Sequence, residues 1–143
     1  MEYFFEFHWW YVLVAFLALV LFTGKRKGGR VVQRFDAELV VLDQRFAGCE
    51  PEASYCVFKE GSPDHIEIEL ENLTLATGEE LEFLLDGSLL ATVKVEQDKE
   101  AEFDHWSDGD VQFPTVQGGE QLTVRYQGAD VLQGTFADRT KAQ

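Results

Sequence analysis

The sequence has few features that would mark a catalytic centre, a disordered chain or a nucleic-acid-binding surface. None of the GxSxG, Walker-loop, GxGxxG or HExxH motifs occurs in it. Only three of its 143 residues are proline and no low-complexity run is present, which argues against disorder in a chain of ordinary apolar content. Basic residues are scarce, 12 against 26 acidic ones, so the net charge is −14. A body this acidic repels DNA and RNA, which are therefore not expected partners.

A long apolar run lies near the N-terminus, YFFEFHWWYVLVAFLALVLF at residues 3–22, with only Glu6 and His8 ionisable. At 1.5 Å per residue such a helix spans about 30 Å, the thickness of the hydrocarbon core of a membrane. Aromatic residues cluster at its start and cations follow its end, whereas a secretory signal has cations first and a small-residue cleavage site last. The pattern predicts a retained single-pass transmembrane helix within residues 1–24.

The cations after this run predict its orientation. Lys and Arg at the end of a span stay on the cytoplasmic side, so we expect the N-terminus outside and the C-terminal domain inside. The same side chains are expected to contact anionic lipid headgroups, at about 1 kcal/mol each. These side chains are Lys25, Arg26, Lys27 and Arg30, which lie in a glycine-containing neck predicted at residues 25–34.

Polar and small residues in the predicted span suggest contacts within the membrane. His8 could ligate a haem or a chlorophyll-type pigment. The plainer interpretation, which we favour, is that Glu6 and His8 lie in the headgroup layer and contact water, because no second ligand is visible. Ala15 and Ala18 are one turn apart and would allow a partner helix to pack closely.

Residues 35–143 carry 24 acidic and seven basic residues, and about 110 residues suffice for one compact domain. Their patterns are those of β-strands. Apolar and acidic residues alternate through 65–75, and 81–95 and 121–136 each contain two apolar runs around a turn, Asp86-Gly87 or Gln127-Gly128. Further strands are expected in 37–42, 54–60 and 100–106. We predict an antiparallel β-sandwich or partly open barrel of about seven to nine strands.

Two cysteines, Cys49 and Cys56, are seven residues apart. They could form a disulfide in an oxidising compartment, whereas in the cytoplasm we expect free thiols, with Cys56 facing the core. A zinc site is not expected, because the domain offers only His65 and His105 as further nitrogen ligands.

The segment DHWSDGD (104–110) is the densest polar cluster. Asp104 and His105 could serve a hydrolase, but no nucleophile lies at a recognisable spacing, and the carboxylates lack the spacing of an EF-hand loop. A turn before a strand is the favoured interpretation. An exposed Trp106 with Phe113 and Pro114 could still form a docking surface.

The layout of MEYFFEFHWWYVLVAFLALVLF followed by KRKGGR resembles that of the H chain of purple-bacterial photosynthetic reaction centres. That resemblance implies one N-out helix and a cytoplasmic β-rich domain that covers a pigment-bearing core. It is a likeness of layout, so no individual residue role is carried over. Residues 113–136 are also similar to β-sandwich repeats of bacterial envelope proteins, which implies an exported domain.

These observations lead to one expected function and two alternatives. The first is a non-enzymatic accessory subunit of a bacterial inner-membrane complex, photosynthetic or respiratory, whose partners are integral membrane subunits and the lipid bilayer. The second is a periplasmic β-sandwich binding protein, anchored N-in, with a Cys49–Cys56 bridge. The third is a hydrolase built on Asp104 and His105.

Overall fold

The computed structural model describes residues 30–140 of the chain. The predicted anchor at 1–24 with His8, Ala15 and Ala18, and the cations Lys25, Arg26 and Lys27, lie outside the described residues. Within residues 30–140, no helix has the length and apolar character needed to cross a membrane.

The described residues form an all-β domain, as the sequence predicts. One short 3-10 helix, η1 (Gln44–Phe46), follows the second strand. The strands are β1 (Val31–Ala37), β2 (Val40–Val41), β3 (Glu50–Phe58), β4 (His65–Glu71), β5 (Glu80–Leu85), β6 (Ser88–Lys94), β7 (Ala101–Trp106), β8 (Gln121–Tyr126) and β9 (Ala129–Asp138).

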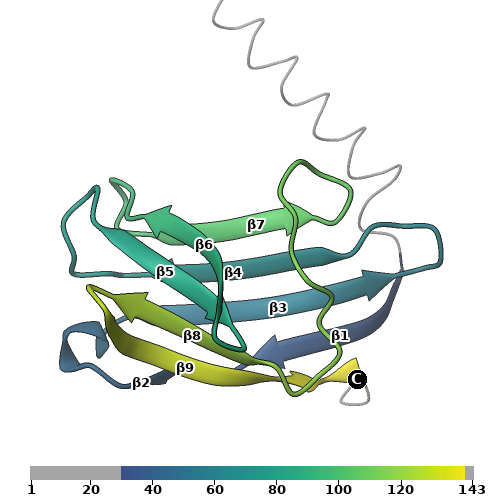
Figure 1. Ribbon diagram of the computed structural model, residues 1–143, viewed down its shortest axis with the longest axis horizontal. Helices are drawn as coiled ribbons and strands as arrows, with labels where there is room; N and C mark the ends of the chain where they lie inside the picture. The colour runs from purple at the N-terminus through teal and green to yellow at the C-terminus, as the bar shows by residue number, and fades with distance from the viewer. Residues whose placement is uncertain (1–29, 141–143) are drawn as a thin grey trace, which may run out of the picture.

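All strand pairs are antiparallel, in the order β6-β5-β8-β9-β1-β3-β4-β7, with β2 paired to β9. The sheet curls on itself into a nearly closed barrel, so that its two end strands, β6 and β7, approach each other where a turn joins them (Figure 1). We call the space between these two unpaired edges the seam. This confirms the predicted architecture and strand number.

The alternating pattern of residues 65–75 predicts a strand, and β4 forms over its first part, His65–Glu71, ending before Asn72, whose φ is 61°. Ile66, Ile68 and Leu70 are completely buried, whereas the glutamates between them reach the outer face of β4. Side chains alternate across a strand, so this spacing fixes which face of β4 packs on the core. The core on the inner side is filled by aliphatic and aromatic side chains of all the long strands.

The two predicted hairpin turns are also confirmed. Asp86 and Gly87 have φ of 51° and 83°, and Gln127 and Gly128 have φ of 51° and 81°. Positive φ at both central residues is the type I′ geometry, whose twist matches that of paired strands. These turns join β5 to β6 and β8 to β9.

The first strand begins earlier than the sequence indicates. Residues 31–34 fall in the range assigned to the neck, yet they belong to β1, which pairs with β3 and β9. Phe35 and Ala37 are buried while Arg34 and Asp36 point outward, and Arg34 Nε lies 2.9 Å from the Asp36 carboxylate. The expected strand at 37–42 is divided between the end of β1 and the short β2.

Segment 107–120 has no regular structure but packs against one end of the barrel (Figure 1). Val116 is buried, and the Phe113 ring lies edge-on to the rings of Tyr55 and Phe103, at 6.2 and 6.4 Å. The Tyr55 hydroxyl donates to Asp64 at 2.5 Å, so this buried side chain links the segment to the β3–β4 loop. Burial and the Asp64 carboxylate raise the pKa of Tyr55, which keeps its hydroxyl protonated.

The cysteines lie differently from the prediction. Both are free thiols, and Cys49 is the one in the core, whereas Cys56 is half-buried on the outer face. The expectation that Cys56 faces inward is wrong because its neighbour Tyr55 takes the inward position. Cys49 directly precedes β3 and Cys56 lies within it, so an extended chain separates them by about 20 Å. A disulfide needs Cα atoms within about 7 Å, so this fold excludes a Cys49–Cys56 bridge.

Candidate functional site

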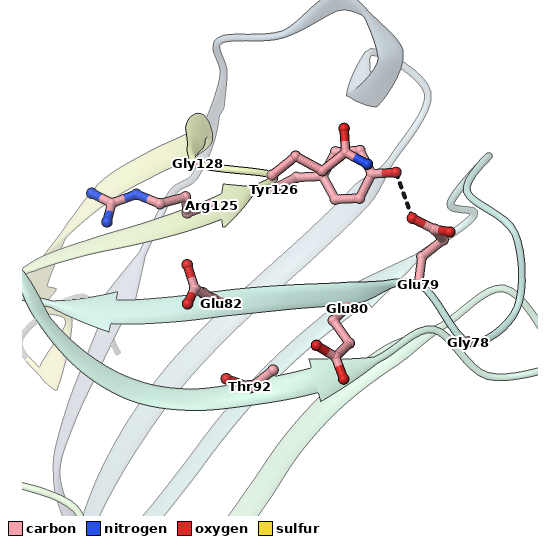
Figure 2. Close-up of a pocket in the computed structure, with 9 residues that line it drawn as sticks. Gly78, Glu79, Glu80, Glu82, Thr92, Arg125, Tyr126 and Gly128 are labelled. Carbon is pink, nitrogen blue, oxygen red and sulfur yellow. Dashed lines mark hydrogen bonds between the residues drawn. The ribbon is translucent and has the colours of Figure 1, made fainter.

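A shallow groove of about 480 Å³ crosses the outer face of β5, β6 and β8 (Figure 2). Its side chains are mostly polar, and three of them are carboxylates. The side chains that line the groove are Glu79, Glu80, Glu82, Thr92, Arg125, Tyr126 and Gln127.

Strand alternation and register position these groups. Leu81 and Phe83 of β5 are completely buried, so Glu80 and Glu82 must point outward. Glu82 stands across from Arg125 of β8 on one side and from Thr92 of β6 on the other. Three neighbouring strands therefore present a guanidinium, a carboxylate and a hydroxyl in one row.

One wall of the groove is held by a hydrogen bond. Tyr126 donates from its hydroxyl to Glu79 at 2.6 Å, drawn as the dashed line in Figure 2. This bond raises the pKa of Tyr126, because a phenolate would face the Glu79 carboxylate. The Arg45 guanidinium lies 5.2 Å from the centre of the Tyr126 ring.

The groove is suited to binding a polar group that carries positive charge. Its carboxylates outnumber its single guanidinium, and Arg125 is already bonded to Asp130 at 3.0 Å.

The DHWSDGD segment splits between two faces of the sheet. Asp104 lies 2.5 Å from Nε2 of His65, and His65 packs on Trp106 at 4.4 Å between ring centres. His105 instead lies against Phe103 at 4.6 Å. Consecutive strand residues point to opposite faces, so the Asp104–His105 pair considered for a hydrolase is not brought together.

The three residues considered for a docking surface are also separated. Trp106 lies on the outer face, 5.5 Å from the Phe58 ring, whereas Phe113 packs toward the core against Tyr55. Pro114 is exposed. The structure thus places Trp106 and Phe113 on different sides of the sheet.

The outer face of β4 and β7 is strongly acidic. Register sets Glu67 opposite Asp104 and Glu69 opposite Glu102, and like charges in this position repel. Partial burial and these neighbours raise the pKa of Glu67, and they raise that of Glu69 to about 6.

Two groups of carboxylates on this face have oxygens within 4.8 Å of one another and could supply oxygen ligands to a hard cation. The first group consists of Glu67, Glu102 and Asp104. The second consists of Glu69, Glu71 and Glu100.

The groove was not predicted from the sequence. The alternation of Glu80 and Glu82 with Leu81 and Phe83 was a usable signal that both carboxylates share one face. The pairing of β5 with β8, which brings Arg125 to that face, joins residues about 40 positions apart and has no local signature.

Comparisons with known proteins assign no family, since no protein-family model matches the sequence and no curated protein shows significant similarity to it.

Proposed function

We propose that this chain is a non-enzymatic accessory subunit of a bacterial inner-membrane complex, with a photosynthetic or respiratory host. Residues 1–24 form its transmembrane anchor, N-terminus outside, and the β-domain covers the cytoplasmic face of the complex. The observation that carries the proposal is the close succession of an apolar run, a cationic cluster and a folded domain whose first strand begins at Val31.

This spacing holds one end of the domain close to the membrane. Val31 and Val32 are 43% and 49% exposed there, and Phe58, His65 and Trp106 cluster at the same end. The cations bind anionic lipid headgroups, and the same headgroups repel the acidic outer face of the domain. A domain in this position is available to neighbouring subunits.

Partner helices recruit the subunit through its anchor. Lipid tails are as apolar as leucine, so helix association depends on close packing, which Ala15 and Ala18 allow, and on polar contacts. A pigment or haem at His8 would add a further contact.

Gentle detergent purification from the native membrane tests this function. We expect integral membrane subunits to co-purify in fixed stoichiometry. Protease added to intact spheroplasts should leave the β-domain uncut, since it faces the cytoplasm. A chain that purifies alone, or a domain digested from outside, would overturn the proposal.

The groove favours a second function, a membrane-anchored envelope protein whose β-domain binds a ligand. This alternative loses the disulfide that the sequence suggested for it, because the extended chain of β3 separates Cys56 from Cys49, which directly precedes the strand. Digestion of the domain in intact spheroplasts would favour it.

A further inference from the structure

We infer that the free edge of β6, together with the groove beside it, binds an extended peptide that alternates basic and apolar side chains. The peptide adds as a further strand to the sheet. This inference goes beyond the proposed function, and its test does not depend on the host complex.

The backbone of β6 is available for pairing. Within the described residues β6 pairs only with β5, so half of its peptide groups point away from the sheet. The turn to β7 begins at Val95, and Glu96 N–H bonds Glu100 there, so the accessible part of the edge is Ser88–Thr92.

The two edges of the sheet differ in their protection. β7 carries the charged side chains of Glu102 and Asp104, which discourage strand addition. Ser88–Thr92 of β6, with the sequence SLLAT, has no charge and no proline, and its Leu89 is 57% exposed. An uncharged, apolar edge is the one that accepts another strand.

The outer face next to β6 favours a basic side chain. Glu82 is separated from the free edge only by the short Thr92, and in the described part of the chain it has no ion-pair partner. A strand added to β6 lies about 10 Å from β5, a distance that a lysine or arginine largely covers across Thr92. The Glu82 carboxylate then receives the positive charge.

The inner side of the same edge favours apolar side chains. Leu90, Ala91 and Val93 are half-buried and pack against the core at the seam. Residues of an added strand that point inward would cover this surface, whereas Leu89, which pairs with Leu84, lies on the outer face. Because side chains alternate along a strand, the preferred ligand alternates basic and apolar residues.

Binding of an eight-residue Lys-Val repeat peptide, labelled with fluorescein, tests the inference. The full chain is titrated in a nonionic detergent and followed by anisotropy. A matched peptide with proline in place of valine has the same charge but cannot form the ladder hydrogen bonds. We expect binding of the Lys-Val peptide and at least about tenfold weaker binding of the Lys-Pro peptide. Equal binding of the two peptides, or no binding of either, would overturn the inference.

Two variants with matched controls locate the site. Glu82→Gln should weaken binding about 2- to 5-fold, and Glu102→Gln on the opposite edge should not. Thr92→Lys places a competing cation beside Glu82 and should weaken binding about tenfold, whereas Thr135→Lys adds the same charge on β9 without effect. Hydrogen exchange should show new amide protection in Ser88–Thr92 on peptide binding. Protection confined to other strands would place the site elsewhere.

Discussion

Gly134 of β9 shows how a single residue sets the distance between two parts of the chain. A Cβ added there would collide with the carbonyl oxygen of Glu38 and lie 3.2 Å from Cα of Leu39. Both contacts are backbone atoms between β1 and β2, which cannot move without disturbing the pairing of β2 with β9.

Gly134→Ala is therefore expected to lower the free energy of unfolding by about 2–3 kcal/mol, the cost of overpacking a tight contact. Urea unfolding of the purified chain measures the change. Gly48→Ala is the matched control, because the nearest atom to its added Cβ lies 3.9 Å away. A Gly134→Ala variant as stable as the control would show that this close approach is not needed.

Glu69 lies among like charges on the outer face, and its effect on stability depends on pH. Its pKa is about 6 in the folded chain against an ordinary value of 4.5, so folding takes up a proton between these pH values. The folded state then gains stability as pH falls through this window and loses it as pH rises through 6. We expect the free energy of unfolding to be higher at pH 5 than at pH 7.

Glu69→Gln should raise stability at pH 7 by about 0.5 kcal/mol, because it removes a repelling cross-strand pair with Glu102. The melting temperature should rise by about 3 °C, and the gain between pH 7 and 5 should shrink. Thermal unfolding at both pH values measures this. Glu60→Gln, at an exposed position in the turn after β3, is the control.

At the scale of the elements, two tight hairpins frame the groove. The β5–β6 turn at Asp86-Gly87 pairs Leu85 with Ser88, and a one-residue register shift between Phe83 and Leu84 then places Glu82 opposite Thr92. Asp86 also accepts a hydrogen bond from the backbone of Gln121 at 2.8 Å, which ties this turn to the start of β8.

Gly87→Val should destabilise the domain by about 2 kcal/mol, because a β-branched residue is strained at a φ of 83°. The space around Gly87 is open, so the cost comes from the backbone and not from a clash. Gly87→Asn, a residue that tolerates positive φ, should cost less than half as much. Denaturant midpoints compare the two variants, and equal losses would mean that the turn conformation is not the cause.

At the scale of the whole molecule, the proposed arrangement gives the anchor and the domain different roles. The anchor recruits the subunit to its complex, and the β-domain covers the cytoplasmic face. Hydrogen bonds between membrane helices average about 0.6 kcal/mol, so no single polar residue in the span decides association. The domain, with its strong negative charge, gains affinity only from partners that present basic groups.

A chimera that carries an unrelated single-pass anchor of the same orientation should reach the membrane but lose its complex. Replacing both Ala15 and Ala18 with Leu should have a milder effect in the same direction, since it prevents close helix packing. Quantitative co-purification measures the loss. A chimera that co-purifies at full stoichiometry would place the recruiting surface in the β-domain.

The sequence alone determined the local features of the domain. Alternation in residues 65–75 defined a strand and its buried face, although the strand ends at Glu71, and Asp86-Gly87 and Gln127-Gly128 defined two hairpins. These signals act over a few residues, through side-chain direction and turn φ, so they can be read without knowledge of the fold. They sufficed for the all-β class and the approximate number of strands.

Only the tertiary structure decided which strands meet. The insertion of β1 between β9 and β3 drew residues 31–34 into the sheet, and the pairing of β5 with β8 placed Glu82 beside Arg125. The same long-range order separated Trp106 from Phe113 and, within residues 30–140, left one edge of β6 without a partner strand. Such pairings depend on loop closure, sheet twist and the burial of many side chains at once, and no single segment of the sequence encodes them.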